Sequence, residues 1–342
     1  MDRNKAAAII VIGVIAGSVV IAAYWYSLNQ PDVRIGYLSK DLHQLALRVA
    51  LENGWFEEEN ITVELVAFQN GALEMSGFQG RQIDMGYLGA APALTKRINE
   101  DIGVTVLAAA NLEGSAIMVR KADFDSGAIT HVANLSGKGV FEPGPSTVQN
   151  FLLRLALEQA GLSYSDLEGA YTTSPLLMAS SLTADTPAFV AWEPFNAKAE
   201  YDGLAVPLIL SGDIWPRHPC CVLAAANDFI DAKPEVVQKV VEIHKRATDW
   251  IVTHVNESID IATAWLEMEE EAVETAFHRI VFDYNVNRTG LQVYLEFLID
   301  QDLLELTSIP SDVPAFIDEF VDSSFIENTL LCCAYVEPTD DP

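Results

Sequence analysis

Short apolar strands and amphipathic helices alternate along the first part of the chain. Residues 33–38, VRIGYL, have the pattern of a strand, and a helix that ends in GWFEEENI follows. The alternating strand TVELVAF, a Gly-bearing loop, a second helix and the short strand IDMGYLG complete a β-α-β-α-β order. The pattern predicts an α/β fold, in which ligands bind at the carboxyl ends of the strands.

The same alternation continues to about residue 210, and helices dominate from Pro234 onward. Two apolar segments, 114–121 and 220–228, have the pattern of strands that cross from one lobe to another. Two crossings imply a discontinuous first lobe and a continuous second lobe. We therefore predict an N-terminal segment and linker, a first lobe and a second lobe, which are residues 1–31, 32–117 plus 222–342, and 118–221.

Length and composition are typical of a folded protein of two lobes. The chain has 342 residues and is 50% apolar, so a sizeable core is possible. Its 20 Lys and Arg residues stand against 49 acidic residues, which gives a formal net charge of −29. Binding to phosphates requires a basic face, so nucleic acid is not an expected partner.

The N-terminus has the pattern of a membrane anchor. The basic start MDRNK is followed by residues 6–23, which carry no charge, and then by three aromatic residues. A membrane-spanning helix needs about 20 apolar residues, and basic residues before it place its start in the cytoplasm. The alternative is a cleaved export signal, with VIAA as the cleavage region. Both interpretations place residues 32–342 outside the cytoplasm, and the first tethers them to the cell membrane.

The four cysteines form two adjacent pairs, Cys220 with Cys221 and Cys332 with Cys333. Disulfides persist outside the cytoplasm, so one or two bridges could tie the C-terminal tail to the middle of the chain. Buried free thiols are an alternative. A metal site made of all four thiolates is the weaker alternative, because it requires wider spacing within each pair.

Candidate ligand-binding residues follow from the places where strands end. Loops at the carboxyl edge of a sheet meet in space, and small residues there let backbone N–H groups approach a ligand. A helix start also offers open N–H donors to an anion, although the same residues serve as ordinary caps and turns. The set that we expect at the mouth between the lobes is Asp41, His43, Gln44, Asn70, Gly71, Leu88, Gly89, Ala90, Glu113, Ser146, Thr147, Trp192, Glu193 and His218.

Some of these candidates suggest particular roles. Ser146 and Thr147 begin a helix after the loop PGP and could hold an anionic group. Glu193 could pair with an amine if the ligand carries one. His218 lies beside Arg217, whose guanidinium suits sulfonate, carboxylate or nitrate oxygens, although a surface position is the plainer expectation for that arginine.

The sequence lacks the common motifs of catalysis. It contains no G-x-S-x-G, H-E-x-x-H, Walker or G-x-G-x-x-G motif, and no Asp-rich calcium loop. We therefore do not expect an enzyme, and no cofactor is predicted.

Several phrases together resemble a known family. GWFEEENITVEL, RQIDMGYLGAAPAL and FVAWEPF, in this order, are similar to the nitrate/sulfonate/taurine class of solute-binding proteins that feed ABC importers. The resemblance extends from Val33 to about Asn287. It implies a two-lobed, hinged periplasmic-binding-protein fold that closes over a small polar ligand and presents it to an ABC permease and its ATPase.

The resemblance leaves two other interpretations open. Relatives that handle pyrimidines share this fold, and some are enzymes with a Cys-rich motif that HPCC, at 218–221, only faintly resembles. The export segment argues against such an enzyme, because vitamin synthesis is cytoplasmic. The other interpretation is a membrane-tethered sensor that binds ligand without feeding a transporter.

Overall fold

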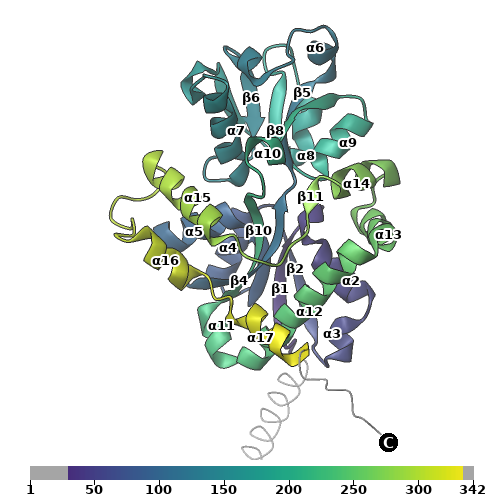
Figure 1. The fold of residues 1–342 in the computed structure, drawn as a ribbon, viewed down its shortest axis with the longest axis vertical. Coiled ribbons are helices and arrows are strands. Elements are labelled where there is room, and N and C mark those ends of the chain that lie inside the picture. The colour runs from purple at the N-terminus through teal and green to yellow at the C-terminus, as the bar shows by residue number, and fades with distance from the viewer. Residues whose placement is uncertain (1–29, 334–342) are drawn as a thin grey trace, which may run out of the picture.

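A computed structural model describes residues 30–333, and these form two α/β bodies, each built around one sheet (Figure 1). The first body has a six-stranded sheet in the order β11-β4-β10-β3-β1-β2, and the second has a five-stranded sheet in the order β7-β6-β8-β5-β9. The strands of the first sheet are β1 (Val33–Leu38), β2 (Val63–Phe68), β3 (Met85–Gly89), β4 (Val104–Glu113), β10 (Pro219–Ala226) and β11 (Ile280–Val281). Those of the second sheet are β5 (Ser115–Arg120), β6 (Gly139–Glu142), β7 (Gly169–Thr172), β8 (Ala188–Trp192) and β9 (Ala205–Leu210).

Helices cover both sheets. Around the first sheet lie η1 (Leu42–Gln44), α2 (Leu45–Glu52), α3 (Trp55–Glu58), α4 (Gly71–Gln79), α5 (Ala90–Asn99), α11 (Asn227–Ala232), α12 (Pro234–Thr253), α13 (Val255–Leu266), α14 (Glu270–Phe277), α15 (Arg288–Asp300), α16 (Val313–Phe320) and α17 (Ser324–Cys333). Around the second sheet lie α6 (Lys121–Asp125), η2 (Val132–Leu135), α7 (Val148–Gln159), η3 (Tyr164–Asp166), α8 (Pro175–Met178), η4 (Ala179–Ser181), α9 (Phe195–Tyr201) and α10 (Ser211–Ile214).

Strand directions show how the sheets are assembled. In the first sheet β1 pairs in parallel with β2 and β3, as β-α-β connections require, while β10 runs antiparallel between β3 and β4. In the second sheet β6 pairs in parallel with β7 and β8, while β5 is antiparallel to β8 and β9. The α/β pattern of the sequence is confirmed, and the carboxyl ends of the parallel strands in both sheets point to the junction of the two bodies (Figure 1).

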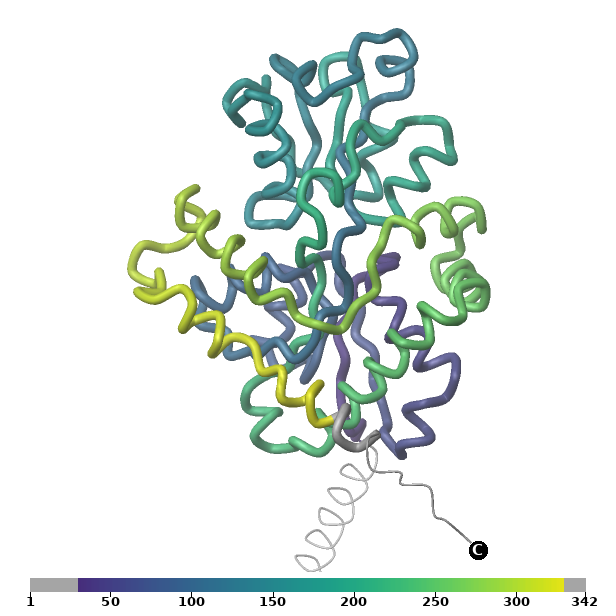
Figure 2. The backbone as a smooth tube through the Cα atoms, viewed as in Figure 1, coloured from purple at the N-terminus to yellow at the C-terminus, as the bar shows by residue number. Residues whose placement is uncertain are grey.

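The chain passes between the bodies at two adjacent places (Figure 2). The strand β4 ends at Glu113, a single residue intervenes, and β5 begins at Ser115 in the other sheet. That residue is Gly114, whose φ of +83° lies in the left-handed region that glycine tolerates best. The return passage runs from α10 into β10. The predicted lobe boundaries at 117/118 and 221/222 stay a prediction.

Alternating side chains of the strands fill a core on each face of the first sheet. Val222 and Ala224 of β10 belong to one buried cluster, and Leu223 and Ala225 belong to the other. Both faces of this strand are therefore covered, which explains the uninterrupted apolar run VLAAA in the sequence.

The predicted membrane anchor or signal, residues 6–23, lies outside the described residues. Within 30–333, the structure contains no helix of the length and apolar character that crossing a membrane would need.

Candidate functional site

A cavity of about 350 Å³ lies between the two bodies, at the ends of their strands. Its wall is formed by the loops after β1, β2 and β3 of the first sheet, and by the loop after β6 and the end of β7 in the second. The start of β10 and the end of β8 complete it. Eight of the residues predicted from the sequence contribute to this wall, and these are Asp41, His43, Asn70, Gly71, Gly89, Ser146, Thr147 and Trp192.

Three helices of more than two turns begin at this wall. Asn70 caps α4 by accepting a hydrogen bond from the backbone of Leu73, at 2.9 Å. Thr147 caps α7 by accepting one from the backbone of Asn150, at 3.2 Å. Gly89 caps α5 without a side-chain hydrogen bond. The ordinary capping role that the sequence allowed is thus present at Asn70 and Thr147, and the first-turn N–H groups still give the wall a positive potential.

The sequence-based prediction missed one face of α5 at the wall. Pro92, Thr95 and Lys96 line the cavity together with Gln149 of α7. Thr95 and Lys96 follow Pro92 by three and four residues, so the three side chains lie on one side of the helix that begins after Gly89. This helical periodicity could have predicted them from the sequence. The ammonium group of Lys96 pairs with Glu100 one turn further along.

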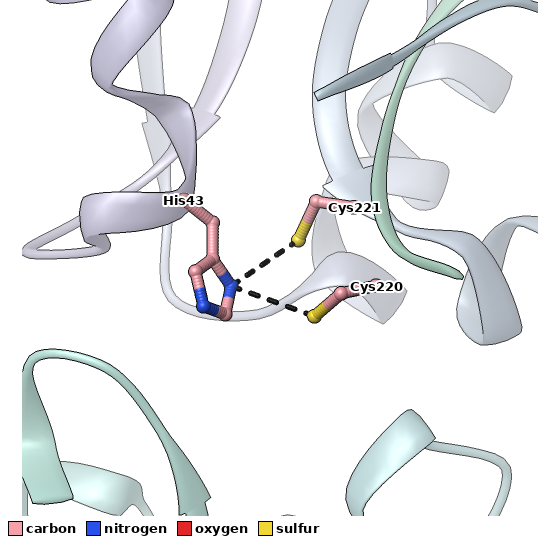
Figure 3. Close-up of side chains that lie close together, drawn as sticks. All are labelled: His43, Cys220 and Cys221. Carbon is pink, nitrogen blue, oxygen red and sulfur yellow. Dashed lines mark hydrogen bonds between the residues drawn. The ribbon is translucent and has the colours of Figure 1, made fainter. Parts of the chain in front are cut away.

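His43, Cys220 and Cys221 bring their side chains together at the wall, and all three are buried (Figure 3). The Nδ1 atom of His43 lies 3.6 Å from the sulfur of Cys220 and 3.6 Å from that of Cys221. On the other side of the ring, Nε2 donates a hydrogen bond to the carbonyl of Gly114, at 3.0 Å. The sequence placed His43 at the site but did not predict its contact with the cysteines.

The electrostatics of this cluster follow from burial and from the close approach of its members. Burial opposes a charge on His43, but the facing sulfur of Cys220 and the carboxylate of Asp41 raise the pKa of its imidazole to about 9. The hydrogen bond from Cys221 and the charge of His43 hold the pKa of the Cys220 thiol well below its usual range. Burial raises the pKa of Asp41 to about 6. The shifts of His43 and Cys220 have a common origin, because a charge on either group favours the opposite charge on the other.

Gln44 does not reach the cavity wall but holds the loop that carries Asp41. Its side chain accepts a hydrogen bond from the backbone of Leu38 at 2.7 Å and donates one to Asp41 at 3.2 Å. Asp41 in turn accepts a hydrogen bond from the backbone of His43, at 2.9 Å. Gln44 is therefore a positioning residue for its neighbours.

Three further candidates are absent from the described cavity wall. Leu88 precedes Gly89 in β3, and because side chains alternate along a strand it points into the core instead. Ala90 is also buried in that core. Glu113 accepts a hydrogen bond from the backbone of Arg217, at 2.7 Å, and so ties the two passages between the bodies together.

Glu193 and His218 also lie away from the described cavity wall. Glu193 is fully buried and pairs with Arg279 at 3.2 Å, so in this arrangement its carboxylate already has a cationic partner, and its pairing with a ligand amine stays a prediction. His218 is buried against Trp215, and its Nδ1 lies 3.0 Å from the carbonyl of Pro219. Arg217 pairs with Asp283 and is exposed, which agrees with the surface position expected for this arginine.

The predicted disulfides are not present among the described cysteines. Cys220 and Cys221 are free and buried, which agrees with the alternative of buried thiols. Cys332 and Cys333 end α17, which packs against α12 and β4 at the far end of the first sheet from the second body (Figure 1).

Comparisons with known proteins agree with this architecture. The model of the NMT1-like family matches residues 27–266. A protein of Brucella abortus that is named as a binding protein is 24% identical over 251 residues, which cover 71% of this chain and 74% of that protein. An aliphatic sulfonates-binding protein of Bacillus subtilis is 23% identical over 279 residues, which cover 80% and 81% of the two chains. These relatives are binding proteins, not enzymes.

A solved structure shows the same fold. The periplasmic nitrate-binding protein from Synechocystis PCC 6803 superimposes with a TM-score of 0.78 at 16% identity, and 91% of each chain is covered. The resemblance that the sequence phrases indicated is thus confirmed, and the fold is a two-sheet α/β fold of the periplasmic-binding-protein type.

Proposed function

The chain belongs to the NMT1-like family, and from this premise we propose that it is an extracytoplasmic solute-binding protein of an ABC importer. Its two bodies close over a small organic anion and present the closed form to the permease and ATPase. The N-terminal segment 6–23 directs the chain out of the cytoplasm, and as an uncleaved helix it keeps the protein at the membrane.

The observation that carries this proposal is the convergence of helix starts from both bodies on one cavity. α4 and α5 approach from the first body and α7 approaches from the second. The N-terminus of a helix attracts anions through its dipole and its open N–H donors. An anion between the bodies is therefore held from both sides, and those contacts exist together only when the bodies are close.

The size and lining of the cavity favour an organic anion over a bare inorganic one. A volume of about 350 Å³ is at the lower end of the range of small-molecule sites. Nitrate has only four heavy atoms and would leave most of this space to water. Leu38, Pro92, Pro145, Val148 and Trp192 supply apolar wall for a carbon body. An alkanesulfonate has a charged head and a short apolar chain, so it fits both the volume and the apolar lining of the cavity. The relative of this protein in Bacillus subtilis is named for binding aliphatic sulfonates.

A thermal-shift series on the purified full-length chain tests the proposal. The panel contains alkanesulfonates of increasing chain length, taurine, nitrate and an aminopyrimidine. A ligand present at 100 times its Kd stabilises a protein by about 2.7 kcal/mol, so a true solute gives a clear rise in Tm. We expect the largest rise with an alkanesulfonate.

The variant Ser146→Phe fills the cavity at the start of α7, so it should abolish the rise. Ser165→Phe places the same ring on an exposed turn of the second body and should leave the rise unchanged. A rise with the aminopyrimidine alone would overturn the choice of ligand. The absence of any rise, or a rise that persists in Ser146→Phe, would overturn the proposed site.

A further inference from the structure

Three soft ligand atoms meet at one point of the cavity wall, on two segments that are 177 residues apart in sequence. They are Nδ1 of His43 and the sulfurs of Cys220 and Cys221, and all three lie within 4.8 Å of one another. We propose that these residues form a three-ligand site for a divalent cation of the zinc class, with its fourth coordination position open to the cavity.

The spacing matches the edge of a zinc tetrahedron. Zinc binds histidine nitrogen at about 2.0–2.1 Å and cysteine sulfur at about 2.3 Å, with tetrahedral geometry. Those bond lengths place a nitrogen and a sulfur ligand about 3.5 Å apart. The two nitrogen–sulfur distances are 3.6 Å each, so an ion could enter with only slight movement of the side chains (Figure 3).

A local irregularity of β10 makes this geometry possible. Neighbouring residues on a regular strand point to opposite faces, so Cys220 and Cys221 would not both face His43. The pairing of β10 with β4 shifts register between Pro219 and Cys221 and again after Cys221. A bulge of this kind re-aims one side chain, and here it brings both sulfurs to the same side.

The surroundings of His43 are those of a metal ligand. Histidine ligands usually donate their second ring N–H to a carbonyl or carboxylate, which fixes the tautomer and the ring orientation. The Nε2 atom of His43 donates to the carbonyl of Gly114, at 3.0 Å, so Nδ1 is the ring nitrogen that faces the sulfurs, and a bound ion would displace the proton from it. The carboxylate of Asp41 lies 3.5 Å from Nδ1 and is held by other hydrogen bonds in an outer position.

The donor set defines the class of ion. Two thiolates and an imidazole favour zinc and other soft or borderline ions, while magnesium and calcium require oxygen ligands. Two thiolates also neutralise the charge of a divalent ion, so the buried cluster carries no net charge once the ion is bound. The three ligands all line the cavity, so the remaining position faces the solute space. The inference does not depend on which solute the cavity accepts.

Cobalt and zinc titrations of the fully reduced, full-length protein test this site. With Co²⁺ we expect one equivalent to bind, with a thiolate-to-cobalt charge-transfer band and the visible bands of tetrahedral coordination. One equivalent of Zn²⁺ should bleach these bands, and an excess of Mg²⁺ should not. Mutation of a residue that only hydrogen-bonds a metal ligand typically lowers metal affinity 10- to 100-fold. Cys221→Ser and His43→Gln each remove a ligand itself, so each should weaken metal binding by more than that.

A control in the tail assigns the site even if the cluster variants do not fold. The chain has only four cysteines, so thiolate bands that persist in the double variant Cys332→Ser/Cys333→Ser must come from Cys220 and Cys221. Absence of a charge-transfer band in the reduced wild-type protein would overturn the inference, as would its loss in the tail variant. Both readouts are made without solute, so the solute panel can fail while the metal site stands, and the reverse.

Discussion

Lys96 is the only lysine or arginine among the described residues of the cavity wall. It extends from the second turn of α5, and its side chain keeps 28% of its surface exposed. A hydrogen bond to a charged group contributes about 1.5–3 kcal/mol, and partial exposure to water reduces that value. The residue is therefore expected to add to solute affinity without being the main source of it.

Replacement of Lys96 with methionine should weaken binding of an anionic solute about tenfold, which corresponds to about 1.4 kcal/mol. Lys121→Met is the matched control, because Lys121 also pairs with an acidic residue four positions later but lies away from the described cavity wall. Titration calorimetry measures both variants. Equal Kd values for Lys96→Met and the wild type would show that the anion does not reach this side of the cavity.

His244 has a pH-dependent effect on stability that is separate from the site. It is buried, its Nε2 donates to the carbonyl of Ala109 at 2.8 Å, and the hydroxyl of Tyr87 lies 3.2 Å from its Nδ1. Burial lowers the pKa of its imidazole from 6.5 to about 4. The unfolded chain therefore binds a proton near pH 6.5 while the folded one does not, so the stability due to neutral His244 is present above 6.5 and is lost as the pH falls toward 4.

Urea unfolding between pH 7 and pH 4 measures this effect. The shift corresponds to about 3 kcal/mol over that interval. His244→Gln keeps polar atoms at the position but cannot titrate, so its free energy of unfolding should fall less across the interval than that of the wild type. Parallel curves for the two proteins would contradict the assignment.

At the scale of elements, β1, β2 and β3 and their order along the chain were accessible from the sequence, because apolar runs of 4–8 residues between turns predict strands. The cavity loops after β1, β2 and β3 followed from that order. The bulge at Cys220 was not accessible, because it depends on how β10 pairs with β4. Glu193 was misplaced for a similar reason. Its partner Arg279 lies 86 positions away, and no local pattern links them.

The passage from β4 to β5 is a tight backbone constraint near the site. A Cβ atom on Gly114 would lie 2.4 Å from Nε2 of His43, and the φ of +83° adds strain for any other residue. Gly114→Ala should therefore destabilise the fold in two ways. A residue with a Cβ atom costs roughly 1–2 kcal/mol in the left-handed conformation, and the displacement of His43 adds a further cost.

Gly127→Ala separates the two contributions. Gly127 has a φ of +77°, but a Cβ atom added to it would meet no other atom within 4 Å, because the residue is exposed on the second body. Chemical denaturation of both variants gives the comparison. A loss for Gly114→Ala no larger than that for Gly127→Ala would mean that His43 moves aside without cost.

An ion-pair network joins the segment between α14 and β11 of the first body to α9 and the residues just before it in the second. Arg279 contacts the buried Glu193 at 3.2 Å and Glu200 of α9 at 2.5 Å. Burial raises the pKa of Glu193, although Arg279 opposes that rise. Removal of the arginine leaves a buried carboxyl without its cation, which is the costly way to break such a pair.

Arg279→Met should destabilise the protein by about 3 kcal/mol, at the lower end of the range for a buried pair that loses one partner. The control is Arg97→Met, because Arg97 is 17% exposed against 14% for Arg279 but its acidic partners, Asp101 and Glu319, are on the surface. That change should cost less than about 1 kcal/mol. Similar losses in thermal unfolding for the two variants would refute the buried network.

At the scale of the whole molecule, the two bodies are joined by adjacent chain passages and enclose a cavity at their junction (Figure 2). Rotation of one body against the other would have to rearrange the contacts between them, which include the packing of Phe151 of α7 against Phe297 of α15 and the pair of Arg279 with Glu193. The solute contacts supply the energy difference between the open and closed forms, since a ligand shifts an equilibrium only by its differential affinity for the two states.

Small-angle X-ray scattering of the full-length protein, with and without a saturating alkanesulfonate, measures this rotation directly. We predict a smaller radius of gyration with the sulfonate, no change with the uncharged alcohol of the same chain length, and no change in Ser146→Phe. Saturation by one sulfonate molecule with an unchanged scattering curve would contradict closure of the two bodies over a solute.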